Sequence, residues 1–448
     1  MDSGIRKIFF GILLGFIGYM VSLFFFDPIH AKLLGVIVFL VTLWTNDGLP
    51  IGVVSLFPIV LFPALGILGT SATTANYSKS TIFLFLGGFL LAIATEKINL
   101  HKVIASKITS IFPSTPLGLI ASLATAAAVL SSFLSNTTTA LLLIPIASFL
   151  TEDLKLKIRL ILSIAYGASI GGIITPIGTP PNLILMGFME SKNLEMISFV
   201  KWMGLTIPLA VVMLALIAYV LSLGLKHAET IKIDAKDKTL TKDQSRLLMI
   251  LGGLIVLLII NSPIKPYYGG LGLDEKVILL SFGLLMFIPK IGFLTWDDSK
   301  KVPYEIMFLF GAGFAIAAAF GKTGLANAIA TKLLVITQLP PFAILICVAL
   351  LITFTTEITS NTALISIALP VIFSLGEAAH MDITLVLMTA TICASYAFML
   401  PIATPPNAIA MSTGFIQVKT MAKYGFVFNI IGVLAISGIS YFFWQYFI

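Results

Sequence analysis

Two short polar motifs occur twice in this sequence, and their side chains are of the kinds that bind ions. Ser-Asn-Thr stands at 135–137 and again at 360–362, and Thr-Pro-Pro-Asn stands at 179–182 and again at 404–407. Serine and asparagine oxygens can ligate a hard cation, and the same side chains cap helix N-termini. The N–H groups at such a terminus favour an anion. Each Ser-Asn-Thr motif can therefore hold a cation and an anion side by side.

The Thr-Pro-Pro-Asn motifs predict breaks in otherwise apolar helices. Proline lacks a backbone N–H and clashes with the preceding turn, which leaves nearby carbonyl groups without a helical partner. The freed carbonyls of Gly178 and Ala403 would complete two cation sites. The hydroxyls of Thr179 and Thr404 would face the same cavity. The prolines responsible are Pro180, Pro181, Pro405 and Pro406.

Both motif pairs share one spacing, which predicts an internal duplication. The second copy of each motif follows the first by 225 residues (360 − 135 and 404 − 179). The segment 87–100 aligns with 312–325 at the same offset. A single Ser-Asn-Thr would more simply serve helix packing through hydrogen bonds. Four motifs in one register indicate a shared role instead.

The composition indicates an integral membrane protein. Of the 448 residues, 58% are hydrophobic and 10% are charged, and the mean hydropathy is +1.07. Apolar runs of about the 17–25 residues that cross a bilayer recur along the whole chain. The net charge of +7 does not imply nucleic acid, because basic residues in such proteins follow membrane topology. The two cysteines and four scattered histidines show no metal-ligand spacing.

The chain divides into four parts on this basis. We expect a first transmembrane span at 1–29, a first repeat at 30–225, a cytoplasmic linker at 226–246 and a second repeat at 247–448. The N-terminal apolar run is retained as a span, because it is long and lacks the cleavage site of a signal peptide. Two regions, 113–150 and 340–375, are apolar but interrupted midway by Ser-Asn-Thr, which predicts re-entrant hairpins buried in protein.

An odd number of spans in each repeat would place the two repeats in opposite orientations. Each repeat has five full spans and one hairpin that returns to its own side, with broken spans around 178–182 and 403–407. The predicted architecture is an all-α membrane protein of about 11 transmembrane helices plus two re-entrant hairpins. Inverted repeats with broken helices near the midplane are typical of secondary transporters.

The distribution of basic residues predicts the orientation in the plasma membrane. With a cytoplasmic N-terminus, 19 of the 27 Lys and Arg residues lie inside, which follows the positive-inside rule. The C-terminus then lies outside. The first hairpin opens inward, because Lys107 and Lys155 flank it. The second hairpin is followed by Gly-Glu-Ala-Ala-His-Met-Asp, without Lys or Arg, and opens outward.

With these motifs in place, the sequence resembles the divalent anion:sodium symporter family. The resemblance rests on the twin Ser-Asn-Thr hairpins, the twin Thr-Pro-Pro-Asn breaks and the segment 85–105, and it covers nearly the whole chain. It implies a homodimer that works as an elevator, in which a transport domain slides against a scaffold. It also implies dicarboxylates, citrate or sulfate as substrates.

The resemblance assigns roles to individual residues by matching position. One sodium ion would be held by Ser131, Ser135, Asn136 and Gly178. A second would be held by Thr356, Thr359, Asn361 and Ala403, with Thr359 acting through its backbone carbonyl. The substrate carboxylates would meet Ser135, Asn136, Thr137, Thr179, Ser360, Asn361, Thr362 and Thr404.

The absence of Lys and Arg from all four motifs bears on the mechanism. An anion held there must be neutralised by helix ends and by bound cations, so sodium is the expected coupling ion. The expected function is sodium-coupled symport of C4-dicarboxylates such as succinate, malate or fumarate. Sodium-independent dicarboxylate exchange (2-oxoglutarate, malate or succinate) and sulfate or citrate as substrate stay open, with an ion channel as a remote alternative.

Two further expectations complete the sequence analysis. No nucleophile, base and orienter occur at a recognisable spacing, so an enzyme is not expected. Glu357 is an intramembrane carboxylate within the second hairpin, and such a group is a functional candidate by default. It would either couple a proton or support the hairpin turn by hydrogen bonding.

Overall fold

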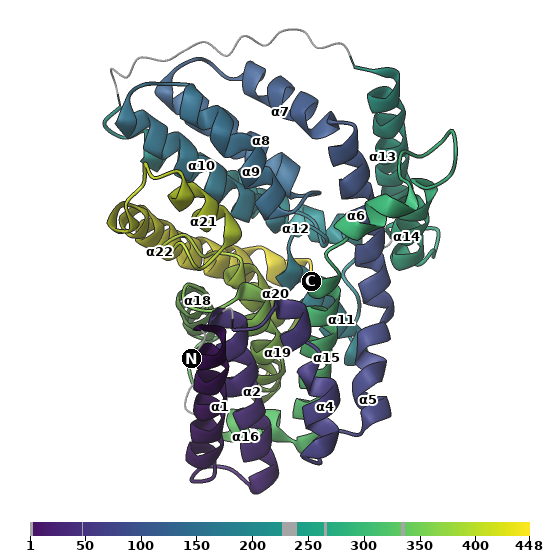
Figure 1. The fold of residues 1–448 in the computed structure, drawn as a ribbon, viewed down its shortest axis with the longest axis vertical. Coiled ribbons are helices and arrows are strands. Elements are labelled where there is room, and N and C mark those ends of the chain that lie inside the picture. Colours follow the sequence, from purple (N-terminus) through teal and green to yellow (C-terminus); the bar gives the residue numbers. More distant parts are fainter. Residues whose placement is uncertain (1–2, 47, 226–239, 264–266, 333–336) are drawn as a thin grey trace.

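The computed structural model describes residues 3–46, 48–225, 240–263, 267–332 and 337–448, which form a bundle of α-helices (Figure 1). Among these residues, eight helical segments are long and apolar enough to cross a membrane. They comprise α1 (Ser3–Ser22), α2 (Pro28–Asn46), α5 (Thr70–Thr74) continued by α6 (Ser80–Lys97), α12 (Phe199–Ser222), α13 (Lys242–Asn261), α15 (Tyr304–Thr323), α19 (Asn361–Ala378) and α22 (Val418–Phe442). The chain is a multi-pass membrane protein.

The first hairpin region consists of two helices, neither of which is long enough to cross a bilayer. They are α8 (Pro116–Ser131) and α9 (Asn136–Phe149), with 16 and 14 residues against the roughly 20 that a span needs. The amphipathic helix α7 (Leu100–Ile111) precedes them. The Ser135 side chain caps α9 by accepting a hydrogen bond from the backbone N–H of Thr138 at 3.0 Å. The predicted break at Ser-Asn-Thr is thus a helix start.

The second hairpin region has the same construction. It consists of α18 (Pro341–Thr356) and α19, and it follows the short helix α16 (Leu325–Lys332). The Ser360 hydroxyl caps α19 by accepting from the backbone N–H of Ala363 at 3.5 Å. Helix α19 continues to Ala378, slightly beyond the predicted end of the hairpin at residue 375.

The predicted broken spans each consist of two helices joined by an unwound segment. In the first, α10 (Leu154–Gly172) is followed by α11 (Pro180–Ser191). In the second, α20 (Ile383–Ala394) is followed by α21 (Pro405–Ser412). The proline pair opens the second helix of each span, where its missing N–H is not needed. The unwound segments therefore lie mainly before the motifs, at 173–179 and 395–404.

Three other segments differ from the simple runs expected from hydropathy. The apolar run after residue 50 forms two short helices, α3 (Ile51–Val54) and α4 (Phe57–Ala64). Helix α13 begins at Lys242, inside the predicted 226–246 linker, because Thr241 and Gln244 form a capping box. Residues 226–239 of that linker lie outside the described residues. The remaining elements are α14 (Glu275–Leu285), η1 (Ala75–Ser78), η2 (Trp296–Lys301) and η3 (Trp444–Tyr446).

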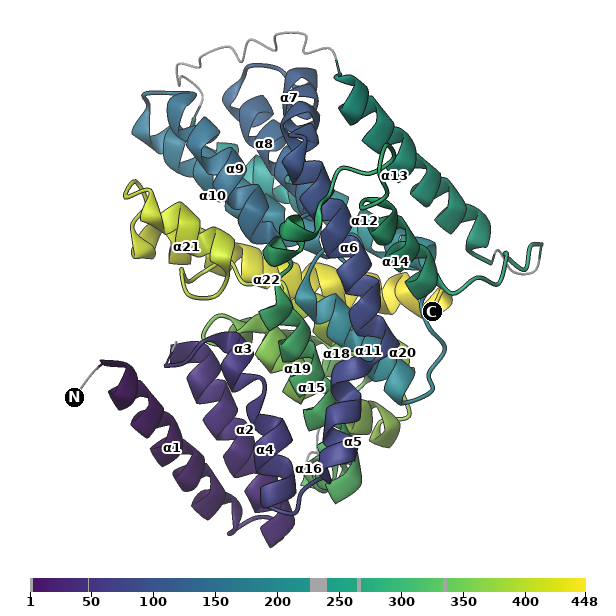
Figure 2. The ribbon, with the colours of Figure 1, turned by 45° about the vertical axis from the view of Figure 1, so that its right-hand side comes forward.

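The helices that begin at the motifs pack across the two halves of the chain. Helix α9 packs on α21, and α11 packs on α19. Figures 1 and 2 show α9 and α10 beside α21 and α22, although the two pairs are far apart in sequence. One large apolar core unites these helices, and a smaller one lies around α2, α4 and α15. The packing brings the four motif-bearing helix starts into one region.

Candidate cation and anion site

The first Ser-Asn-Thr motif closes on the end of the helix before it. The hydroxyl of Ser131, the last residue of α8, donates to Oδ1 of Asn136, the first residue of α9, at 2.5 Å. Ser131 is fully buried, whereas Ser135 is exposed. The predicted cation ligands Ser131 and Asn136 are therefore in direct contact.

The first broken span meets this motif at Gly172, the last residue of α10. A Cβ atom placed on Gly172 would lie 2.9 Å from Oδ1 of Asn136 and 3.1 Å from Cβ of Thr179. A Cβ atom on Gly178 would lie 2.6 Å from the carbonyl oxygen of Gly172. Only glycine permits these approaches. The structure thus brings together Asn136, Gly178 and Thr179, which the sequence analysis assigned to one ion site.

The second motif repeats the first contact. The Thr356 hydroxyl donates to Oδ1 of Asn361 at 2.6 Å and to the carbonyl oxygen of Ala394 at 2.9 Å. Ala394 is the last residue of α20, so this hydroxyl also joins the hairpin to the second broken span. The Thr359 hydroxyl is engaged with the carbonyl of Thr355 at 2.9 Å, which leaves its backbone carbonyl as the group available to an ion.

The asparagines that end the Thr-Pro-Pro-Asn motifs hold the unwound segments in shape, a role that the sequence analysis missed. Nδ2 of Asn182 donates to the carbonyl oxygens of Gly172 at 3.0 Å and Thr175 at 2.9 Å. Nδ2 of Asn407 donates to those of Ala397 and Leu400, both at 3.0 Å. These partners are again 225 residues apart (397 − 172 and 400 − 175). The conserved spacing of the motif pair was the signal for equivalent roles.

The two asparagine amides also carry oxygen atoms that bear on cation binding. Asn182 and Asn407 are fully buried, and Oδ1 of each has no hydrogen-bond partner among the described residues. Buried amide oxygens without a donor are costly unless another group satisfies them. Together with hydroxyl and carbonyl oxygens nearby, they make an all-oxygen environment of the type that hard cations prefer. The residues present at both breaks therefore fit sodium.

Glu357 holds the unwound segment of the second broken span. Its Oε1 accepts from the backbone N–H groups of Phe398 at 2.8 Å and Met399 at 2.9 Å, and its Oε2 accepts from that of Leu400 at 3.0 Å. Asn429 of α22 adds a fourth hydrogen bond to Oε1 at 2.6 Å. The carboxylate is 3% exposed. This is the hydrogen-bonding alternative considered for Glu357, and it acts on the broken span rather than on the hairpin turn alone.

The first repeat has no carboxylate at the matching position, which is Ser132 (357 − 225). There the Thr175 hydroxyl donates to the Ser132 carbonyl oxygen at 2.5 Å and joins hairpin and broken span. The two candidate cation sites therefore have similar ligands but different supports. The second has a buried negative charge beside it and the first does not.

The remaining predicted substrate residues occupy the first turns of the motif-bearing helices. Thr137 follows Asn136 in α9, and Thr362 follows Asn361 in α19. Thr179 and Thr404 are the N-cap residues of α11 and α21, with nearly identical extended backbones (φ −146° and −143°). Every predicted substrate residue therefore lies at the N-terminus of one of four half-helices.

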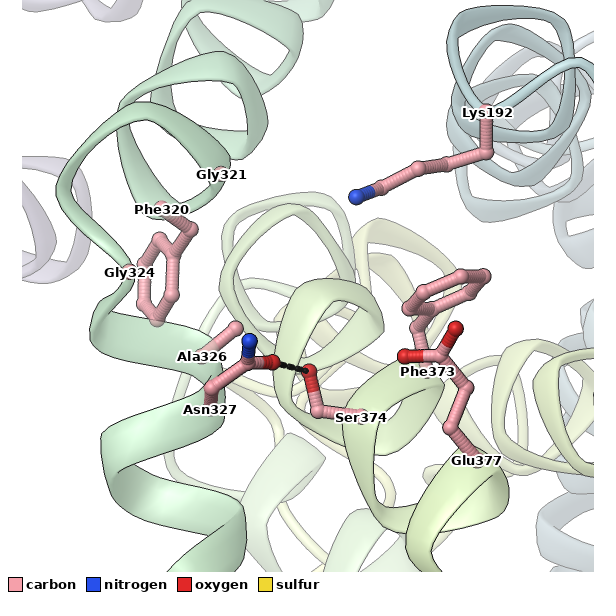
Figure 3. Close-up of a pocket in the computed structure, with 9 residues that line it drawn as sticks. All are labelled: Lys192, Phe320, Gly321, Gly324, Ala326, Asn327, Phe373, Ser374 and Glu377. Carbon is pink, nitrogen blue, oxygen red and sulfur yellow. Dashed lines mark hydrogen bonds between the residues drawn. The ribbon is translucent and has the colours of Figure 1, made fainter. Parts of the chain in front are cut away.

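A cavity of about 280 Å³ lies apart from these motifs, between α11, the α15–α16 junction and α19 (Figure 3). Lys192 points into it, and Nζ lies 4.6 Å from the centre of the Phe373 ring. Asn327 Oδ1 accepts from the Ser374 hydroxyl at 3.2 Å on its wall. None of the predicted site residues lines this cavity.

Comparison with known proteins gives consistent results. Residues 36–392 match a family model described as citrate transporter. The sodium-dependent dicarboxylate transporter SdcS of Staphylococcus saprophyticus is 32% identical, covering 96% of this chain and 90% of that protein. SdcS of Staphylococcus aureus is also 32% identical, with the same coverage of both chains.

Solved structures show a similar fold at low sequence identity. The YdaH transporter of Alcanivorax borkumensis has a TM-score of 0.58 at 14% identity, covering 89% of this chain and 90% of its own. MtrF of Neisseria gonorrhoeae, described with a class of antimetabolite efflux pumps, has a TM-score of 0.60 at 13% identity, covering 98% and 94%. At this identity the likeness concerns the fold alone.

The fold and the paired sites define a membrane transport protein and not an enzyme. The chain belongs to the divalent anion:sodium symporter family, as its motifs predicted.

Proposed function

We propose that this protein is a secondary active transporter that couples the uptake of C4-dicarboxylates, such as succinate, malate or fumarate, to sodium. The observation that carries the proposal is the meeting of four half-helix N-termini with two hydroxyl–amide oxygen pairs. The helices are α9, α11, α19 and α21, and the pairs are Ser131–Asn136 and Thr356–Asn361. Each half of the chain contributes half of this arrangement.

The charge of the arrangement matches a dianion. A helix N-terminus carries about half of a positive elementary charge, so four of them supply about two charges when directed at one region. No Lys or Arg lies in the motifs to add to this. Two sodium ions bound beside the substrate would supply the remaining neutralisation. Anion binding should therefore depend strongly on the cation.

The relatives support this choice of ion and substrate. The proteins with 32% identity over most of this chain are named as sodium-dependent dicarboxylate transporters. The first sodium would meet Ser131, Ser135, Asn136 and Gly178, and the second would meet Thr356, Thr359, Asn361 and Ala403. When bound, the ions supply positive charge and ordered ligation, and the hydroxyls and amides of the chain orient the substrate carboxylates.

We further propose an elevator, in which α8–α12 and α18–α22 move as one transport domain. The scaffold would consist of α1–α6 and α13–α15, and the working unit would be a homodimer. Close glycine contacts run along the boundary between these two groups: Gly187 of α11 faces Phe314, and Gly313 of α15 faces Ser366. Surfaces that meet through small residues without interlocking side chains are suited to sliding.

One polar contact on that boundary must break during such a movement. Glu190 at the end of α11 accepts from Lys276 of α14 at 2.8 Å, from Ser80 of α6 at 2.6 Å and from Thr81 at 2.5 Å. These bonds link the proposed transport domain to the proposed scaffold. They are compatible with one position of the elevator and stabilise that position.

Uptake into empty proteoliposomes tests the proposal. Vesicles without internal anion are given external radiolabelled succinate with either sodium or potassium at equal concentration. We expect accumulation with an inward sodium gradient and no accumulation with potassium. Uptake that occurs only after preloading with an unlabelled dicarboxylate, and without sodium, would replace symport by exchange. Uptake that does not saturate would indicate a channel.

A further inference from the structure

Helix α1 lies at the edge of the bundle and packs chiefly on α2 (Figure 2). Only 11% of its membrane-crossing window is buried inside the protein. The contact depends on small residues: a Cβ atom on Gly15 would lie 3.1 Å from the carbonyl oxygen of Gly35, and Gly11 and Gly18 also face α2. Because α1 approaches α2 so closely and no other helix as much, it forms one wall of an open groove.

The groove between α1, α2 and α4 is large and apolar. Its volume is about 460 Å³, against the 30 Å³ or so that one water molecule occupies in the liquid. Ile12 and Phe16 on its α1 wall are 51% and 59% exposed. The apolar side chains that line it include Ile12, Phe16, Tyr19, Phe39, Leu61 and Leu65. In a bilayer this surface faces hydrocarbon, so it will be filled by apolar matter and not by water.

A single charged residue, Lys32, lines the groove near the turn between α1 and α2. Its Nζ donates to the carbonyl oxygen of Leu65 at 3.3 Å, which uses one of the three ammonium donors. A second ammonium lies near that turn, because Nζ of Lys332 is 5.3 Å from the centre of the Phe26 ring. The polar end of the groove is therefore positive.

The length of the groove matches one membrane leaflet. Lys32 and Phe39 are seven residues apart on α2, which corresponds to about 10 Å along the helix axis at 1.5 Å per residue. Half of the hydrocarbon core of a bilayer is about 15 Å thick. The groove thus begins near a headgroup level and extends through most of one leaflet.

We propose that this groove is a binding site for an anionic phospholipid, with an acyl chain between α1 and α4 and the phosphate group at Lys32. The chain supplies dispersion contacts along the apolar walls, and the headgroup accepts hydrogen bonds from the ammonium donors that remain free. The lipid completes the lateral support of α1, which α2 alone holds against the bundle.

Native mass spectrometry of the full-length protein tests the proposal. The detergent-purified protein is titrated with dioleoyl phosphatidylglycerol or dioleoyl phosphatidylcholine, which share their acyl chains and differ in headgroup charge. The first phosphatidylglycerol should bind about fivefold more tightly, the effect expected of one lysine near an anionic lipid. Lys32→Gln should remove this preference, whereas Lys322→Gln, which removes an exposed lysine outside the groove, should keep it.

A second variant tests the acyl-chain part of the site. Leu61→Trp should fill the groove and weaken the first binding event of both lipids by a similar factor. Equal binding of the two lipids to the unaltered protein would overturn the proposal, as would equal behaviour of Lys32→Gln and Lys322→Gln. Disulfide cross-linking of an Ile12→Cys variant between copies would also overturn it, because a second copy would then cover the groove.

Discussion

Asn182 and Asn407 lie 225 residues apart in the chain and make the same pair of hydrogen bonds. Each side-chain amide reaches back from the first turn of a half-helix to two carbonyl groups of the unwound segment that precedes it, at 2.9 to 3.0 Å. Each amide thereby closes a loop that contains a candidate cation ligand, Gly178 in the first and Ala403 in the second. The two ion sites are shaped by one device used twice.

Removing either amide should destabilise the protein. Asn182→Ala and Asn407→Ala would each leave two buried carbonyl groups unpaired, at a cost of about 1–3 kcal/mol per unsatisfied group. We expect a lower Tm by tryptophan fluorescence in detergent for both variants. Asn327→Ala, which changes an exposed asparagine outside the motifs, serves as the control. Tm values equal to that control would contradict the structural role.

Asn136→Ala and Asn361→Ala test the two hydroxyl–amide pairs directly. Each variant removes an oxygen that accepts from Ser131 or Thr356 and that we assign to a cation and to the substrate. Initial rates of sodium-driven succinate uptake should fall at least tenfold, which corresponds to about 1.4 kcal/mol of lost interaction. Near-normal uptake by both variants would remove the motifs from the site. Asn327→Ala should transport normally.

Glu357→Gln separates a supporting role from proton coupling. A glutamine has one acceptor oxygen and presents an NH₂ group where the carboxylate accepts from backbone N–H groups, so the segment at 398–400 should loosen. We expect a raised half-saturation concentration for sodium in succinate uptake, together with a lower Tm. In the unaltered protein, a proton gradient without sodium should drive no uptake. Proton-driven uptake that disappears in Glu357→Gln would show that the carboxylate carries the proton.

The ion pair between Lys97 and Asp298 makes a pH-dependent contribution to stability. Lys97 Nζ lies 2.6 Å from Oδ2 of Asp298, and this hydrogen bond, with help from the backbone N–H of Thr295, lowers the pKa of Asp298 to about 2. An unfolded aspartate titrates near 3.9, so the folded state favours the ionised form. The stabilisation is therefore present above about pH 4 and is lost as the pH falls toward 2.

Asp298→Asn should accordingly lower the Tm at pH 7, and the deficit should shrink below about pH 4. Asp297→Asn is the matched control, because its partner Lys300 and Asp297 itself are both largely exposed and such pairs contribute little. The measurement is a series of thermal unfolding curves between pH 3 and pH 7. A deficit for Asp298→Asn that stays constant across this range would exclude the ion pair as its cause.

Much of the helical architecture could be predicted because membrane depth imposes strict rules on backbone polar groups. Runs of apolar residues mark spans, and Ser135 and Ser360 mark the points where two of them must stop, since each caps a new helix. The shared offset of the motifs predicted that both halves would build similar contacts. The pairs Ser131–Asn136 and Thr356–Asn361 have that similarity.

Other features depend on contacts between distant segments and leave no local pattern. The Glu357 carboxylate finds its partners 41 to 72 residues away, at Phe398 and Asn429, and hydropathy cannot pair them. The start of each unwound segment was placed too late, because the prolines mark where the second helix begins and not where the first one ends. The first helix ends earlier, where side chains from other helices bind its free carbonyl groups.

Equilibrium binding of radiolabelled succinate to the purified protein, with sodium replaced by choline at constant ionic strength, tests the central claim most directly. Without lysine or arginine at the site, the substrate depends on the neighbouring cations, and at an effective dielectric of about 20 a charge pair at about 4 Å contributes roughly 4 kcal/mol. We therefore predict that the Kd for succinate rises at least tenfold without sodium. A Kd that is the same in sodium and in choline would contradict this account of the site.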